Sequence, residues 1–131
     1  MTTRLAELDA ARSLLGDAVT TLQQGWVQDR WQGREGVCLV GSLQVAGRGR
    51  QLTARSLDLV WHALVDDAHD LGWVPSPQVR LARVRDLTRW NDRHGRTVQE
   101  VVALIRRAEQ LAAAEMVRLR AELGFVAPAR T

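Results

Sequence analysis

Three adjacent side chains that can form hydrogen bonds, Trp90, Asn91 and Asp92, end an arginine-rich segment of the chain. Asn and Asp favour turns and helix ends because their side chains bond to nearby backbone groups. Gly95, just beyond them, permits a left-handed turn. In one interpretation Trp90 fills the core while Asn91 and Asp92 tie down loop amides, which makes the three a structural latch. In the other they line a binding site. We favour the latch, with Asp92 pointing inward.

Six arginines and two aspartates lie between residues 80 and 96, so this segment has a net charge of +4. The arginines are Arg80, Arg83, Arg85, Arg89, Arg93 and Arg96. A basic helix beside a turn is typical of a nucleic-acid contact, and guanidinium groups also bind carboxylates and phosphates in a bidentate way. Three interpretations stay open: a nucleic-acid surface, a surface for an acidic protein, or a solvated helix face whose arginines pair with acids elsewhere in the chain.

Cys38 is the single cysteine of the chain, which excludes an intramolecular disulfide. A thiol at the start of a helix has a lowered pKa, and a histidine partner would make it a nucleophile. The spacing of the three histidines places none of them near Cys38, and its neighbours Val37 and Leu39 are apolar. A buried structural cysteine is therefore the interpretation we favour.

Two further patterns could bind ligands. Asp58, His62, Asp66 and His69 follow one another at helical spacing, and two histidines with two carboxylates can hold a divalent metal. Such a stripe beside the core face is more typical of a solvated ladder. The glycines of residues 47–50 resemble a fragment of a phosphate-binding loop, but Leu52 stands where a further glycine would be needed and no lysine follows. We expect no metal and no cofactor.

These residues must be positioned by helices. Apolar periodicity predicts helices over residues 3–24, 54–71 and 77–90, and a last helix that runs from about residue 97 to a stop at Gly124. Residues 37–46 are ambiguous: Val37 to Val40 could form a buried strand, but we favour a short helix that begins near Val37. The fold class is all-α, a single-domain orthogonal bundle of about five helices. The domain spans residues 1–126, and residues 127–131 form a polar tail.

Local residues define several of these helix ends. Thr53 is a plausible N-cap for the third helix, and Gly72 with Pro75 marks its end. Ser76 followed by Pro77 is typical of a helix start, and Thr97-Val98-Gln99-Glu100 is a capping box.

The same periodicity predicts which side chains face the core. In the helix over residues 77–90 we expect four to point inward and the arginines to lie on the flanks and the outer face. The inward set is Leu81, Val84, Leu87 and Thr88. The small residues Gly41 and Ser42 would let another helix approach closely.

The sequence also indicates a compartment. Its beginning lacks the apolar segment of a signal peptide, and no stretch reaches the ~20 apolar residues of a membrane span. We therefore expect a cytoplasmic protein of a bacterium or an infected host cell, with no membrane contact.

The order of the motifs resembles that of an uncharacterised family, a domain of unknown function found in small proteins of actinobacteria and their phages. The motifs are Gly25-Trp26, Gly33-Arg34, Cys38-Leu39-Val40-Gly41-Ser42-Leu43, Trp90-Asn91-Asp92 and Arg96-Thr97-Val98-Gln99-Glu100-Val101. Ser42 replaces the usual alanine. The resemblance covers about residues 5–115 and implies no activity. It implies that Cys38 and Trp90-Asn91-Asp92 belong to one scaffold, and that the source is an actinobacterium or a phage.

We expect a non-enzymatic helical binding module, encoded by a bacterium, a prophage or a phage, because no credible catalytic set is present. Its binding residues would be Arg83, Arg85, Arg89, Arg93, Arg96, Trp90, Asn91, Asp92 and Cys38, and its partner a protein or a nucleic acid. One alternative is a small enzyme or nucleotide-binding protein with a pocket around Cys38 and Trp90-Asn91-Asp92. The other is a structural subunit of a phage particle or of a homo-oligomer.

Overall fold

A computed structural model describes residues 2–47, 49–69, 71 and 75–124 of the chain. It contains five helices: α1 (Thr2–Gln24), α2 (Leu39–Ala46), α3 (Arg50–Leu64), α4 (Pro77–Asp92) and α5 (Val98–Glu122). Two short strands, β1 (Gln32–Gly33) and β2 (Gly36–Val37), form an antiparallel hairpin between α1 and α2. The predicted all-α bundle is confirmed. The expected tail over residues 127–131 lies outside the described residues.

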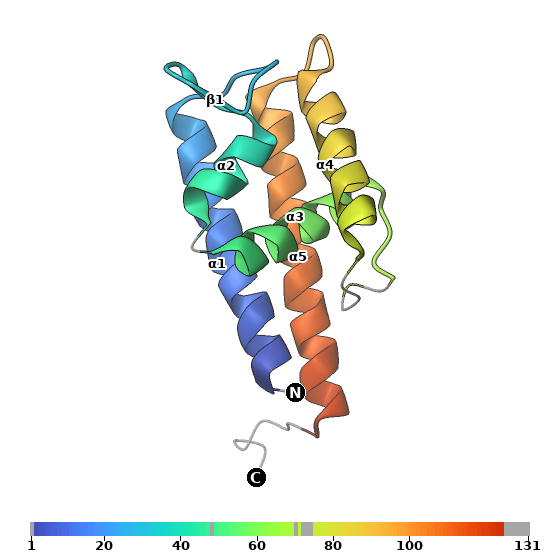
Figure 1. The fold of residues 1–131 in the computed structure, drawn as a ribbon. Coiled ribbons are helices and arrows are strands. Elements are labelled where there is room, and N and C mark those ends of the chain that lie inside the picture. Colours follow the sequence, from blue (N-terminus) through green and yellow to red (C-terminus); the bar gives the residue numbers. More distant parts are fainter. Residues whose placement is uncertain (1, 48, 70, 72–74, 125–131) are drawn as a thin grey trace.

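The two long helices α1 and α5 run side by side in opposite directions and make the most extensive helix contact (Figure 1). The shorter α2 and α3 pack across this pair, and α4 lies at the edge, where its main contacts are with α3 and α2. The β hairpin and the turn between α4 and α5 lie at the same end of the bundle (Figure 1). This shared end is where the candidate site is found. Among the described residues, no helix is long and apolar enough to cross a membrane.

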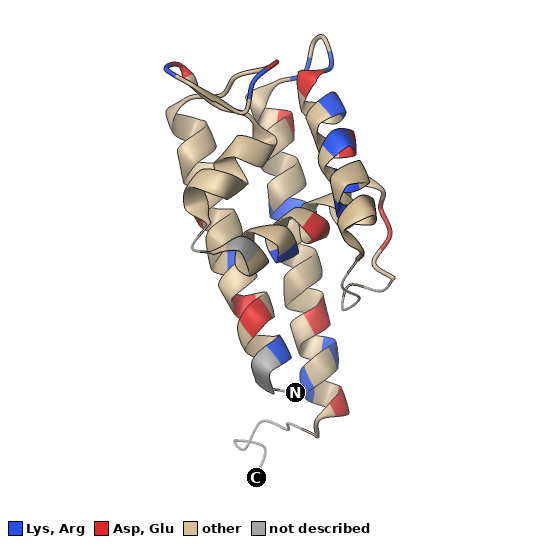
Figure 2. Ribbon diagram, in the orientation of Figure 1, with Lys and Arg blue, Asp and Glu red and all other residues tan. Residues whose placement is uncertain are grey.

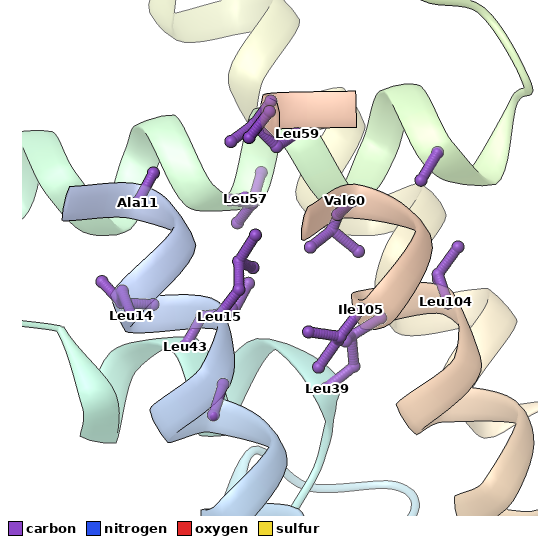
Figure 3. Close-up of a cluster of buried hydrophobic side chains, with 14 of the residues drawn as sticks. Ala11, Leu14, Leu15, Leu39, Leu43, Leu57, Leu59, Val60, Leu104 and Ile105 are labelled. Carbon is purple, nitrogen blue, oxygen red and sulfur yellow. The ribbon is translucent and has the colours of Figure 1, made fainter. Parts of the chain in front are cut away.

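Aliphatic side chains from α1, α2, α3 and α5 fill the core (Figure 3). Leu15, Leu43, Val60 and Ile105 represent the four helices, and each is completely shielded from solvent. Burying a leucine or isoleucine of this kind stabilises the fold by about 1.5–3 kcal/mol relative to leaving it exposed. The core therefore holds these four helices together, and α4 adds one fully buried aliphatic side chain, Leu87.

A buried carboxylate joins the outer ends of α1 and α5. Glu115 accepts a hydrogen bond from Arg4 at 3.0 Å and two from Arg118 at 2.6 and 2.7 Å. The bonds from Arg118, followed by the charge of Arg4, hold the pKa of Glu115 below its ordinary value of 4.5.

Four of the predicted helix ends are confirmed. α1 stops before Gly25, and α4 begins with a Ser76 side chain that accepts from the Val79 amide. The capping box of α5 is complete, because the Thr97 hydroxyl accepts from the Glu100 amide while the Glu100 carboxylate accepts from the Thr97 amide. Gly124 has a φ of 75° directly after α5, as expected for a glycine stop.

The prediction for the third helix, residues 54–71, is wrong at both ends. α3 begins at Arg50, so Thr53 lies inside the helix and Gly49 is the N-cap residue. α3 ends at Leu64 because Asp66 adopts a left-handed φ of 55°. Asp is one of the few residues that enter this conformation readily, so the helix stops before Gly72, which lies outside the described residues.

Both interpretations of residues 37–46 are partly right. Val37 belongs to β2, Cys38 is an N-cap residue, and α2 begins at Leu39. The nearest neighbour of Gly41 is a loop and not the helix that we expected: a side-chain carbon there would lie 1.9 Å from the Trp31 carbonyl oxygen. Gly41 is therefore needed because a loop carbonyl crosses it.

The predicted inward face of α4 is partly wrong. Leu87 is buried and Val84 packs against the core, but Leu81 is 51% exposed. Arg83, expected on the flank or the outer face, is only 6% exposed. The apolar pattern did not predict the inward face correctly, because the side of α4 that packs against α3 buries the charged Arg83 beside Asp58.

Candidate functional site

Asn91 lies at the centre of a hydrogen-bond network that joins α4 to the segment between α1 and α2. Its Oδ1 accepts from Trp26 Nε1 at 2.8 Å and from the Leu39 amide at 3.1 Å. Its Nδ2 donates to the Val27 carbonyl at 3.2 Å and to Asp92 Oδ1 at 3.0 Å. An asparagine side chain offers two donors and two acceptor lone pairs. All four are used, and Asn91 is fully buried, so this side chain has no capacity left for a ligand.

The neighbouring backbone is tied down in the same way. Gln28 Nε2 donates to the carbonyls of Asn91 and Arg93, both at 2.9 Å. Asp92 Oδ1 also accepts from the Asp29 amide at 2.9 Å, and Asp29 holds a left-handed φ of 66°. Asp92 therefore bonds to a loop amide, as the latch interpretation expects. We call Trp26, Gln28, Asp29, Asn91 and Asp92 the Asn91 latch.

Trp90 and Arg96 close the turn that follows the latch. The Arg96 guanidinium lies 4.0 Å from the centre of the Trp90 ring, and its Nε donates to the Trp90 carbonyl at 2.8 Å. Arg96 also pairs with Glu100 at 3.3 Å. The Thr97 amide, with Arg96, holds the pKa of Glu100 below its ordinary value. Trp90 is thus half-buried beneath a guanidinium rather than fully in the core, and Arg96 is engaged within the fold.

Cys38 is a buried structural residue. It is 1% exposed, and its Sγ accepts from the Gly41 amide at 3.3 Å as the N-cap of α2. Burial raises the pKa of the thiol, although a position at the start of a helix would by itself lower it. A nucleophilic cysteine needs an accessible thiolate, and Cys38 provides neither accessibility nor a lowered pKa.

Two of the six predicted arginines are used to attach α4 to α3. Asp58 Oδ2 accepts from Arg80 at 2.8 Å, and Asp58 Oδ1 lies 3.4 Å from Arg83 Nη1. The Arg83 guanidinium also lies 4.1 Å from the centre of the Trp61 ring, whose Nε1 donates to Asp86 at 3.0 Å. Breaking a buried ion pair by removing one partner costs about 3–5 kcal/mol, so Arg83 is a structural residue and not part of an open binding surface.

The three remaining arginines are exposed. Arg85, Arg89 and Arg93 have no side-chain hydrogen bond, ion pair or ring contact with any other described residue. We call them the α4 arginine row, because they follow at steps of four residues along α4 and its C-cap. Figure 2 shows basic bands along α4 and in the turn after it. Of the five arginines predicted as binding residues, Arg83 and Arg96 have partners within the fold, and Arg85, Arg89 and Arg93 have none among the described residues.

The four residues weighed as possible metal ligands, Asp58, His62, Asp66 and His69, do not come together around one point. Asp58 is paired with arginines, and His62 Nδ1 lies 2.8 Å from the Asp67 carbonyl. His69 is exposed and lies 2.9 Å from the Asp67 carboxylate, and Asp66 is in the turn beyond α3. Within the described ranges, no group of three or more His, Cys, Asp or Glu side chains could hold an ion.

An open groove of about 620 Å³ lies between the end of α1 and the start of α5. Its lining is Leu22, Gln23, Gly25, Trp26, Val98, Gln99, Val102 and Ala103. None of these side chains titrates at neutral pH or can act as a nucleophile, and Cys38, Asn91 and Asp92 are not among them. The groove therefore offers no acid, base or nucleophile for chemistry.

The sequence profile of a family of unknown function (DUF6197) matches residues 1–111. The chain belongs to this family. The matched segment of this DUF6197 protein includes the Asn91 latch, Cys38 and the α4 arginine row. Searches of curated proteins and of solved structures found no match.

Sequence reasoning missed several partners in this DUF6197 chain. From the sequence alone, Trp26 is noted only in the Gly25-Trp26 motif and no role is assigned to Gln28 or Asp29, although all three bond to residues more than sixty positions later. Asp58 was considered only as a metal ligand, although it pairs with Arg80 and Arg83. The one usable indication for Asp58 was its place beside the apolar stripe of α3, where a buried carboxylate requires a cation.

Proposed function

We propose that this DUF6197 protein is a non-enzymatic binding module that engages an anionic macromolecule through the α4 arginine row. We place its action in the cytoplasm of an actinobacterium or of a phage-infected cell, in keeping with the motif resemblance. The observation that carries the proposal is the separation of the arginines into two groups: Arg80, Arg83 and Arg96 have partners inside the fold, whereas Arg85, Arg89 and Arg93 point out without one among the described residues.

The absence of reactive groups at the candidate site supports binding rather than catalysis. All four hydrogen-bonding positions of the Asn91 side chain are occupied within the fold, and Cys38 is buried with a raised pKa. The groove beside Trp26 carries no titratable lining residue. A general acid or base must reach its substrate with a suitable pKa, and none of these groups does so.

A matched pair of double variants tests the proposal. Arg85→Glu with Arg89→Glu reverses two charges of the row, whereas Arg107→Glu with Arg120→Glu reverses two exposed charges on α5. Arg83 is left unchanged because its reversal would place a carboxylate against Asp58 and unfold the contact between α3 and α4.

Tagged protein is used to recover partners from an actinobacterial lysate, with and without nuclease, and the eluates are quantified by mass spectrometry and nucleic-acid staining. We expect wild type and the α5 variant to recover the same partner, and the α4 variant to lose it while its circular dichroism is unchanged. Recovery of the same partner by the α4 variant would refute the proposal. Light scattering on the same samples tests the rival interpretation as a homo-oligomeric subunit, which requires an assembly that both variants retain.

A further inference from the structure

We infer that the partner of the α4 arginine row is an acidic α-helix of another protein, which packs its own row of carboxylates against the outer face of α4. This inference rests on the proposed function and narrows it from any anionic macromolecule to one class. It draws on three features: the spacing of the row, the exposed leucine that continues it, and the small number of free charges.

The row has the geometry of a helix surface. Leu81, Arg85, Arg89 and Arg93 follow at steps of four residues, so successive members are about 6 Å apart along the axis and the set spans about 18 Å. Rows of residues four apart are inclined to the helix axis by about 26°, so the row of a partner helix with carboxylates at every fourth position runs parallel to this one when the two helices cross at about −50°. Three Arg–carboxylate pairs could therefore form at once, each with the bidentate geometry that guanidinium groups favour.

The two acids next to the row on α4 are already engaged within the fold. Asp86 accepts from Trp61 Nε1, and Asp92 accepts from the Asp29 amide and the Asn91 side chain. They therefore do not fold over the arginines, whose positive charges are left to an external carboxylate.

Leu81 distinguishes a protein partner from a nucleic acid. Leu81 lies one helical turn before Arg85 and is 51% exposed, as one of the few exposed large apolar side chains among the described residues. A partner helix with a leucine one turn beyond its last glutamate would cover Leu81, and burying apolar surface stabilises the complex by about 25 cal/mol per Å². A phosphate backbone offers Leu81 no comparable contact.

The charge count also disfavours nucleic acid. Three free arginines neutralise three phosphates, which gives a slope of log K against log salt of about −2.7, compared with about −5 to −9 for proteins that make six to ten phosphate contacts. Past Arg93 the row meets the segment between α1 and α2, whose Asp29 amide bonds to Asp92. The acids of this segment, Asp29 and Glu35, are balanced by Arg30 and Arg34, so the segment adds no net positive charge that would extend the row for a polyanion.

The test uses the full chain and three fluorescent probes in anisotropy titrations. The first is a helical peptide with glutamates at three successive four-residue steps and a leucine one turn beyond. The second has the same composition with the glutamates distributed around the helix. The third is duplex DNA of about 20 base pairs. Protein variants are Arg89→Glu, Leu81→Ala and the control Arg107→Glu.

We expect the first peptide to bind about tenfold more tightly than the second, which corresponds to about 1.4 kcal/mol. Arg89→Glu should weaken it about tenfold and Leu81→Ala about threefold, while Arg107→Glu should leave it unchanged. Equal affinity for the two peptides, or loss of binding in the Arg107 variant, would overturn the inference. If DNA binds more tightly than the first peptide and Leu81→Ala does not change its affinity, the inference is overturned but the proposed function is retained. Failure to bind any of the three probes would overturn both.

Discussion

Replacing Asn91 by aspartate changes one atom of the latch and reverses its role. The Nδ2 group that donates to the Val27 carbonyl and to Asp92 Oδ1 becomes an oxygen that faces two other oxygens. The two bonds accepted by Oδ1 from Trp26 and Leu39 are kept. The substitution therefore isolates the donor half of the network without opening a cavity.

The size of the effect follows from these contacts. Each lost hydrogen bond costs about 1 kcal/mol. A second carboxylate about 4 Å from Asp92 adds a repulsion of up to about 4 kcal/mol at an effective dielectric constant of 20, less the screening that half-buried Asp92 receives from water. We expect Asn91→Asp to lower the free energy of unfolding by about 3–5 kcal/mol near neutral pH, a large part of the 5–15 kcal/mol typical of a domain.

Urea unfolding followed by circular dichroism measures this loss. Repulsion raises the pKa of the new carboxyl in the folded state above its unfolded value, so the deficit should shrink as the pH falls from about 7 to about 4.5 and the carboxyl is protonated. Gln78→Glu, the same amide-to-acid change on the exposed side of α4, is the control and should change stability by less than about 0.5 kcal/mol. A deficit below about 1 kcal/mol near neutral pH, or one that does not vary with pH, would show that Asn91 is not the centre of the latch.

Three further perturbations test other parts of the fold. Gly41→Ala should lower the free energy of unfolding by about 1–3 kcal/mol, because the new carbon would lie 1.9 Å from the Trp31 carbonyl oxygen. The control, Gly16→Ala inside α1, has its nearest neighbouring atom at 3.9 Å and should raise the free energy of unfolding by about 0.5–1 kcal/mol. Chemical denaturation measures both, and equal effects would contradict the close approach of the Trp31 carbonyl to Gly41. Cys38 should react with iodoacetamide only on unfolding, since it is buried with a raised pKa, and labelling at the rate of a free thiol in folded protein would show that it is accessible. The arginine partners of Glu115 lower its pKa in the folded state. The stability that Glu115 contributes is therefore present above its unfolded pKa and is lost as the pH falls through its folded pKa. Glu115→Gln should make the free energy of unfolding less dependent on pH on the acid side, and an unchanged pH dependence would show that Glu115 does not stabilise the fold in this way.

Residues close together in sequence determine the parts of the fold that could be predicted. The Ser76 hydroxyl accepts from the Val79 amide, and the side chains of Thr97 and Glu100 accept from each other's amides. Both partners of each capping bond lie within three residues, so a short stretch of sequence is enough to predict it. The helical stripes of α1 and α5 are equally local, because each repeats every three or four residues over six or more turns.

Long-range pairing could not be predicted. Nothing near Asn91 indicates that its side-chain oxygen Oδ1 accepts from Trp26, 65 residues earlier. The burial of Arg83 depends on Asp58 in another helix, so the preference of arginine for solvent gave the wrong expectation. α3 ends early because Asp66 adopts a left-handed conformation. The residues around Asp66 allow this conformation but do not require it, so the helix end could not be predicted.

The manner in which α4 is attached has a consequence for the dynamics of the folded state. The core is shared by α1, α2, α3 and α5, whereas α4 is held chiefly by Leu87, the Asp58 ion pairs and the Asn91 latch. Elements with few buried apolar contacts open locally at a lower free energy than the rest of the domain. Backbone amides of α4 should thus exchange with deuterium earlier than those of α1 and α5, and as one cooperative unit. Any partner that binds along α4 would slow that exchange without altering the exchange of the four-helix core.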